Sequence, residues 1–138
     1  MNYMRVYIAY KYRAIEDKNQ LKQDLQRVSD AIEHLQHRPF VLGRDIQKWH
    51  SSSSSVFRTI PHILINIIKS DIVFAFINTS AKSWGLKFEM LCCKILGKPV
   101  IVAIKAGVAF ELQGIKPTAT IEFSDVDDLV SKINTLSI

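Results

Sequence analysis

Hydrophobic residues follow two different spacings along this chain of 138 residues. Short runs rich in β-branched and aromatic residues predict five β-strands, which are Arg5–Tyr10, Phe40–Leu42, Asp71–Ile77, Pro99–Ile104 and Thr118–Phe123. Between these runs, apolar residues recur at steps of three and four, which predicts amphipathic helices. The helical segments are 16–35, 60–69, 84–96 and 125–136.

Alternation of strands and helices on this scale predicts an α/β fold. We expect one three-layer, Rossmann- or flavodoxin-like domain over residues 1–138, with a mostly parallel five-stranded sheet and helices on both faces. Pro39 ends the first helix, and Gly43 marks a turn. Two stretches are less regular, because Gly107–Gly114 fits either a short helix or a loop and the run Ser51–Ser55 predicts a loop.

The segment Ile60–Ile68 is unusually apolar for a surface helix. Its isoleucines and leucine cover more than one helical face, which predicts burial against something larger than its own sheet. A second subunit would cover that surface, so we expect a homodimer or a larger homo-oligomer.

Composition narrows the classes of partner and compartment. The net charge of +5 is spread without a dense basic run, so we expect no nucleic-acid partner. No apolar run is long enough to cross a bilayer and residues 1–13 lack the apolar core of a secretory signal, so we expect no membrane partner. The only cysteines, Cys92 and Cys93, are adjacent and cannot form an ordinary disulfide, which favours the cytoplasm. His34 and His37 lack a third ligand, so we predict neither a metal nor a cofactor.

The segment between the third and fourth predicted strands carries the chemistry. It reads Ser-Trp-Gly-Leu-Lys-Phe-Glu from Ser83 to Glu89. Ser83 is a natural N-cap for the helix that follows, and the free N–H groups of a helix start bind anions. Glu89 lies one turn inside that helix, on the side of Gly85. An anion cradle beside a fixed carboxylate at the edge of an α/β sheet suits chemistry on the sugar of a nucleotide.

Two segments of the chain resemble a known family. One is the first strand with its loop, Arg5 to Arg13, and the other runs from Lys69 through Ser-x-Gly-x-x-x-Glu to the Gly-Lys-Pro turn at residues 97–99. Together they resemble the nucleoside 2-deoxyribosyltransferase-like superfamily, which includes the deoxynucleoside 5′-monophosphate N-glycosidases. TIR domains look like more distant relatives.

The resemblance implies roles for several residues. Glu89 matches the nucleophile that attacks the anomeric carbon and displaces the base, and Tyr7 matches a strand tyrosine near the sugar. Ser83 and Gly85 match the residues that hold a 5′-phosphate. Arg13 matches a position in the loop that lines the nucleotide pocket, and the neighbouring Tyr10 and Tyr12 are substrate-binding candidates.

The chain departs from the family in three places. The family carries an acid on the helix before the central strand, where this chain has Ile63, and Asp45 is the candidate substitute. Relatives often have glycines at positions 10–12, so we expect a narrower pocket here. Lys87 replaces a small residue and supplies either a charge for a phosphate or an ordinary solvated side chain.

These observations leave three functions open. The first is a nucleoside or nucleotide N-glycosidase or deoxyribosyltransferase with Glu89 as nucleophile. The second is a nucleotide-binding module that has lost turnover because Ile63 replaces the acid, and the third is a TIR-like signalling domain that cleaves NAD. Each site residue also has a plainer interpretation, in which Glu89 is a surface glutamate, Ser83 only a helix cap and Tyr7 a core residue.

Overall fold

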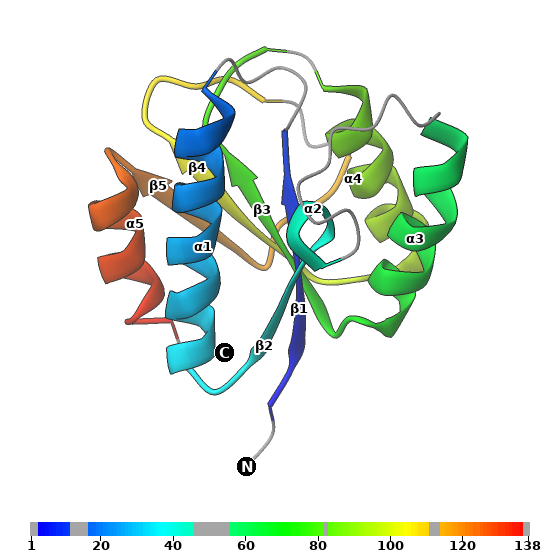
Figure 1. The fold of residues 1–138 in the computed structure, drawn as a ribbon, viewed down its shortest axis with the longest axis horizontal. Helices are drawn as coiled ribbons and strands as arrows, with labels where there is room; N and C mark the ends of the chain where they lie inside the picture. Colours follow the sequence, from blue (N-terminus) through cyan, green and yellow to red (C-terminus); the bar gives the residue numbers. More distant parts are fainter. Residues whose placement is uncertain (1–2, 12–16, 46–55, 82, 111–113, 137–138) are drawn as a thin grey trace.

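Five strands of the protein form one sheet, which is parallel throughout (Figure 1). The structure is a computed structural model that describes residues 3–11, 17–45, 56–81, 83–110 and 114–136. The sheet order is β2-β1-β3-β4-β5, and the strands are β1 (Arg5–Tyr10), β2 (Arg38–Val41), β3 (Ile72–Ile77), β4 (Val100–Lys105) and β5 (Ala119–Phe123). The expected α/β fold with a five-stranded sheet is confirmed.

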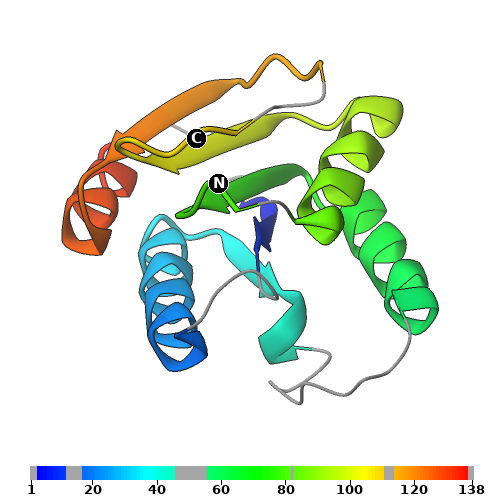
Figure 2. The ribbon, with the colours of Figure 1, turned by 90° about the horizontal axis from the view of Figure 1, so that it is seen from above.

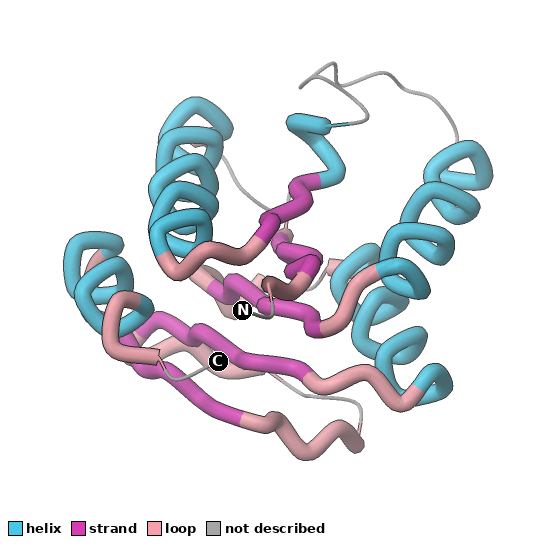
Figure 3. The backbone as a smooth tube through the Cα atoms, turned by 90° about the horizontal axis from the view of Figure 1, so that it is seen from below, coloured by secondary structure: helices cyan, strands magenta, loops and turns pink. Residues whose placement is uncertain are grey.

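Helices cover both faces of this sheet. They are α1 (Lys18–His34), α2 (Leu42–Asp45), α3 (Val56–Lys69), α4 (Trp84–Leu96) and α5 (Val126–Ile133). Figure 2 shows α1 and α5 on one face and α3 and α4 on the other, so the expected three layers are present. Figure 3 shows the same arrangement from the opposite side. The two resulting cores use alternate residues of each strand, so that Val6 and Ile8 pack toward α1 while Tyr7 and Ala9 pack toward α3 and α4.

The helix starts follow the capping residues in the sequence. Asp17 caps α1 by accepting the N–H of Gln20, and Asp125 caps α5 by accepting the N–H of Asp128. Ser83 caps α4 by accepting the N–H of Leu86 at 3.3 Å. Each such cap stabilises its helix by about 1 kcal/mol.

The structure differs from the sequence-based prediction around the second strand. β2 begins at Arg38 and includes Pro39, which is tolerated because β2 is an edge strand and needs ladder bonds on one side only. Gly43 does not form a simple turn but lies inside the one-turn helix α2. The Ser51–Ser55 loop lies outside the described residues, and so does part of Gly107–Gly114, whose described residues form a turn and no helix.

The apolar helix α3 is not buried all round within this chain. It begins at Val56, four residues before the expected start, and buries Ile63 and Ile67 against the sheet. Leu64, Ile65 and Ile68 are 38%, 48% and 50% exposed. A single chain therefore does not bury the outer side of α3 as predicted, and only a partner molecule could cover these side chains. Among the described residues, no helix combines the length and apolarity that a membrane span requires.

Candidate functional site

Glu89 and Tyr7 meet in the interior although they are 82 residues apart in sequence. Tyr7 lies in the middle of β1 and is fully buried, and its hydroxyl donates a hydrogen bond to Oε2 of Glu89. Glu89 is on the second turn of α4 and is only 6% exposed. A glutamate on the outer face of an amphipathic helix would be solvated, so the plain surface interpretation of Glu89 is wrong.

Burial governs the proton affinity of this pair. It raises the pKa of Glu89 from its ordinary 4.5 to about 8, although the hydrogen bond from Tyr7 acts in the opposite direction. The pKa of Tyr7 is raised well above its ordinary value, first by burial and then by the nearby Glu89 carboxyl. At neutral pH, the resting pair therefore carries its protons and no net charge.

The walls around the pair are apolar. The rings of Tyr7 and Phe40 lie with their centroids 5.6 Å apart. Tyr7 belongs to the same buried hydrophobic cluster as Ile63, Leu86 and Cys93, and Glu89 is itself only 6% exposed. Within such surroundings, an ionised carboxylate is strongly disfavoured unless a ligand or a hydrogen-bond donor stabilises it.

The segments that follow the carboxyl ends of β1, β3 and β4 contact one another. Lys11 follows β1 and reaches the backbone oxygens of Thr79 and Ala81, which follow β3. The ring of Phe110, after β4, lies 4.9 Å from the Lys11 ammonium. These contacts tie three loops together directly before the N-cap of α4 at Ser83.

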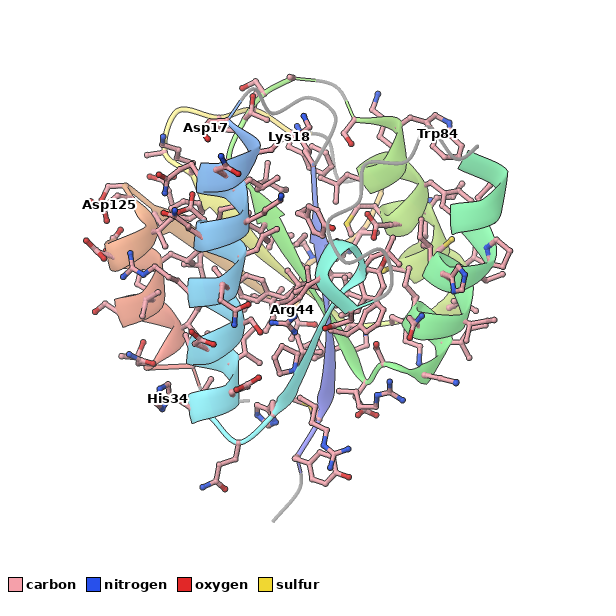
Figure 4. The ribbon with its side chains drawn as sticks, viewed as in Figure 1. Asp17, Lys18, His34, Arg44, Trp84 and Asp125 are labelled. Atoms are coloured by element: carbon pink, nitrogen blue, oxygen red, sulfur yellow. The ribbon has the colours of Figure 1, made fainter. Side chains whose placement is uncertain are left out.

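The start of α4 is open to solvent. Trp84 is 57% exposed and stacks on Phe88 with 5.3 Å between ring centroids. A side-chain carbon at Gly85 would meet no atom within 4 Å, so there is open space above this turn of helix. Figure 4 places Trp84 at the same end of the molecule as Asp17 and Asp125, where the strands end.

The candidate residues separate into those that gather around Glu89 and those that do not. Tyr7 contacts Glu89, and Ser83 and Gly85 lie one to two turns away on the same helix. Tyr10 is partly buried against the core under α1, on the face of β1 opposite Tyr7. The structure thus does not bring Tyr10 to Glu89, because side chains alternate along a strand. Tyr12 and Arg13 lie outside the described residues.

Asp45, the candidate substitute for the missing acid, is engaged elsewhere. Its carboxylate accepts the N–H of Val41 at 2.8 Å and pairs with Arg44 at 2.9 Å. Arg44 in turn donates to the hydroxyl of Ser29 on α1 at 2.7 Å. These contacts hold Asp45 beside α1 rather than beside Glu89. Asp45 therefore does not replace the acid that is missing at position 63.

Lys11 and Phe110 take part in these loop contacts and were not among the predicted site residues. Strand alternation contained a signal for Lys11, because Lys11 continues the alternation of Tyr7 and Ala9 directly beyond the end of β1 at Tyr10. No local signal marks Phe110, whose position depends on how the segment after β4 folds back.

A separate cavity of about 450 Å³ lies on the other face of the sheet, between α1 and α5. It is lined by the capping residues Asp17 and Asp125, by Lys105 at the end of β4, and by Asn78, whose buried side-chain oxygen has no hydrogen-bond partner among the described residues. Neither Tyr7 nor Glu89 lines it. In the part of the chain that the structure describes, no three histidine, cysteine or acidic side chains converge to hold a metal.

Solved structures similar to this chain include enzymes that act on nucleotides and nucleosides. The CMP N-glycosidase BcmB of Clostridium botulinum superposes with a TM-score of 0.70 at 16% identity, over 96% of this chain and 99% of that one. The 2-deoxyribosyltransferase of Bacillus psychrosaccharolyticus superposes with a TM-score of 0.70 at 24% identity, over 97% of this chain and 93% of that one.

A conserved protein from Enterococcus faecalis V583 is also similar, with a TM-score of 0.67 at 11% identity over 96% of this chain and 98% of that one. No protein-family model matches the sequence, and no curated protein matches it. These similarities show that the chain shares its fold with a CMP N-glycosidase and a 2-deoxyribosyltransferase.

Proposed function

We propose that the protein breaks the N-glycosidic bond of a nucleoside or nucleotide, with Glu89 as the nucleophile. The observation that carries this proposal is the buried hydrogen bond between Tyr7 and Glu89 on one face of a parallel sheet. Buried carboxyls with a strongly shifted pKa and a specific hydrogen-bond partner cluster at functional sites. The similarity in fold to a CMP N-glycosidase and a deoxyribosyltransferase supports this chemistry.

The reaction has two steps. A carboxylate oxygen of Glu89 bonds to the anomeric carbon while the bond from that carbon to the base nitrogen breaks, and the base leaves with the electron pair. Water then attacks the sugar ester, which gives hydrolysis, or a second base attacks it, which gives transfer. Tyr7 orients the attacking oxygen and stabilises its negative charge through the hydrogen bond.

The leaving base receives its proton from solvent in this proposal. The position where the family has an acid is occupied by the buried Ile63, and Asp45 is bound to Arg44 and Val41. A positioned general acid typically accelerates such a step by about 10²–10⁴. We therefore expect a slow enzyme that works best on bases that leave readily.

The experiment that tests the function measures free base by chromatography after incubation with deoxynucleosides, their 5′-monophosphates and NAD. The wild type should release base, and Glu89→Gln should release none because an amide is a poor nucleophile. Glu33→Gln, on the exposed side of α1, is the matched control and should behave as the wild type. Equal release by wild type and Glu89→Gln would refute the role of Glu89.

A nucleotide-binding module without turnover is the second candidate. The buried Ile63 favours this candidate, because among the described residues no acid lies near Glu89 to protonate the leaving base. In this case nucleotides would raise the unfolding temperature of the protein without any release of base. Base release by the wild type would exclude it, and cleavage restricted to NAD would favour the TIR-like alternative.

We also propose that the protein forms a homodimer through the outer surfaces of α3 and α4. These helices cover the same face of the sheet (Figure 2). Their outward positions carry large apolar side chains that are 38–75% exposed, among them Leu64, Ile65, Ile68, Leu91 and Ile95. Exposed apolar residues at this density are typical of an interface.

A further inference from the structure

The loop that joins β3 to α4 depends on a side chain from another strand for two of its backbone hydrogen bonds. The backbone oxygens of Thr79 and Ala81 lie in this loop, and among the described residues no backbone N–H donates to either of them. Nζ of Lys11 donates to both, at 2.7 Å to Thr79 and 2.6 Å to Ala81. Backbone oxygens away from water need such a partner, so Lys11 supplies what the loop does not supply for itself.

Lys11 is enclosed on all sides. It is only 1% exposed, and the ring of Phe110 lies 4.9 Å from its ammonium group. The neighbouring Ala109 also reaches the loop, since its N–H donates to Oγ of Ser80 at 3.0 Å. A buried ammonium group is costly unless acceptors satisfy it. The lysine and the loop therefore fix each other in one arrangement.

The strand β1 contacts the next helix at a second point. Tyr7 in β1 donates to Glu89 on the second turn of α4, and Lys11 directly follows the end of β1. Its acceptor Ala81 lies two residues before Ser83, which caps α4. One strand thus holds both the carboxyl on α4 and the loop that leads into α4. Because a helix moves as a rigid element, the place where α4 begins decides where Glu89 lies relative to Tyr7.

We propose that Lys11 is a positioning residue for the reaction of Glu89, because it holds the loop before α4 so that this helix presents the carboxyl to Tyr7. The inference rests on the proposed N-glycosidase function and assigns Lys11 no contact with the substrate. A displacement of a reacting group by about 1 Å can reduce a rate about 10²-fold, so a contact away from the reacting atoms can control kcat.

The kinetic test measures kcat and KM for base release in the wild type and in Lys11→Met, which keeps the buried aliphatic chain but cannot donate. We expect kcat to fall about 10–100-fold while KM changes less than about 3-fold, because Lys11 does not bind the substrate. In a Tyr7→Phe background the same substitution should reduce kcat less than about 3-fold, because no hydrogen bond to Glu89 remains to be aligned. Equal reductions in the two backgrounds would overturn the proposal.

Lys98→Met is the matched control. Nζ of Lys98 also donates to two backbone oxygens, those of Ile68 at 3.0 Å and Ser70 at 2.8 Å, but these oxygens lie where α3 leads into β3, at the amino end of that strand. The variant should lower the melting temperature, as Lys11→Met does, and keep kcat within about 2-fold of the wild type. A reduction of kcat as large as that in Lys11→Met would overturn the proposal, because general loosening of the fold would then explain both.

A carbon-13 NMR titration of the Glu89 carboxyl separates this inference from the proposed function, because it requires no turnover. The signal is identified by its absence in Glu89→Gln. The hydrogen bond from Tyr7 lowers the pKa of Glu89, so misalignment in Lys11→Met should raise the titration midpoint by about half a pH unit or more. Lys98→Met should leave the midpoint unchanged.

A milder variant keeps the test valid if Lys11→Met fails to fold. Phe110→Leu removes only the ring beside the ammonium group and should raise the midpoint of Glu89 by a smaller amount. A raised midpoint without any base release would support the positioning contact and refute the enzyme. Base release together with an unchanged midpoint in every folded variant of Lys11 and Phe110 would overturn the positioning role alone.

Discussion

At the scale of single residues, the chemistry of the site depends on where the proton of Glu89 resides. The nucleophile must be ionised, but burial raises its pKa to about 8 in the free protein. The value of kcat/KM should therefore rise about 10-fold per pH unit below pH 8 and level off above it. A rate profile measured from pH 5.5 to 9.5 checks this, and a flat profile below pH 8 would show that Glu89 is not the titrating nucleophile.

Removal of the phenol should shift that profile. The hydrogen bond from Tyr7 lowers the pKa of Glu89, so Tyr7→Phe should move the rise in kcat/KM to higher pH and reduce the activity at pH 7 by about 10–100-fold. A structural defect would lower the rate equally at every pH. Tyr3→Phe, which changes an exposed tyrosine outside the site, should leave the profile unchanged.

The same carboxyl should weaken the fold at high pH. Between pH 4.5 and about 8 the unfolded chain ionises Glu89 while the folded protein keeps it protonated, so this group lowers the free energy of unfolding as pH rises through that window. Glu89→Gln cannot ionise and still offers an acceptor to Tyr7. Its melting temperature should exceed that of the wild type by about 5 °C or more at pH 9 and should match it near pH 4.

Calorimetric scans at the two pH values provide that comparison. A constant difference between the variant and the wild type at both pH values would mean that Glu89 ionises freely in the folded protein. A variant that is more stable but inactive would show that Glu89 lowers the stability of the fold while it is required for activity.

At the scale of elements, the N-cap of α4 fixes the start of the helix that carries Glu89. Ser83 satisfies the N–H of Leu86, and Leu86 is itself buried three residues before Glu89. Ser83→Ala should lower the free energy of unfolding by about 1 kcal/mol, which corresponds to about 4 °C in melting temperature. Ser131→Ala on the exposed side of α5 is the control and should change the melting temperature by less than about 2 °C. An unchanged melting temperature in Ser83→Ala would show that water replaces the cap.

At the scale of the whole molecule, the exposed apolar surface of α3 and α4 decides the state of assembly. Ile65 is 48% exposed, so Ile65→Glu should leave the fold intact and should dissociate the proposed dimer by burying an unpaired charge in its interface. Light scattering at matched concentrations would report the change in mass. Asn19→Glu adds the same charge on exposed α1 and should leave the mass unaltered. A wild-type protein that is monomeric would contradict the proposal.

Local patterns were sufficient for most of the architecture. The runs of β-branched residues specified the strands because a strand buried on both faces, such as β3, needs apolar side chains at consecutive positions. Ser83 predicted the start of α4 as its N-cap, since an orphan N–H needs a partner whatever the tertiary fold, and the structure shows Asp17 and Asp125 capping α1 and α5 in the same way. The prediction of a simple turn at Gly43 was wrong, because this residue lies in the one-turn helix α2, and a glycine is compatible with either conformation.

The candidate site depended more on tertiary structure. The sequence by itself determined that Ser83 caps a helix and that Glu89 lies one turn inside it, because capping and helical periodicity act over a few residues. Only the tertiary structure decided that Glu89 is buried against Tyr7, that Tyr10 and Asp45 lie away from it, and that Lys11 contacts the loop after β3. These facts depend on strand order and on contacts between loops distant along the chain, and burial and proton affinity follow from that three-dimensional packing rather than from local spacing.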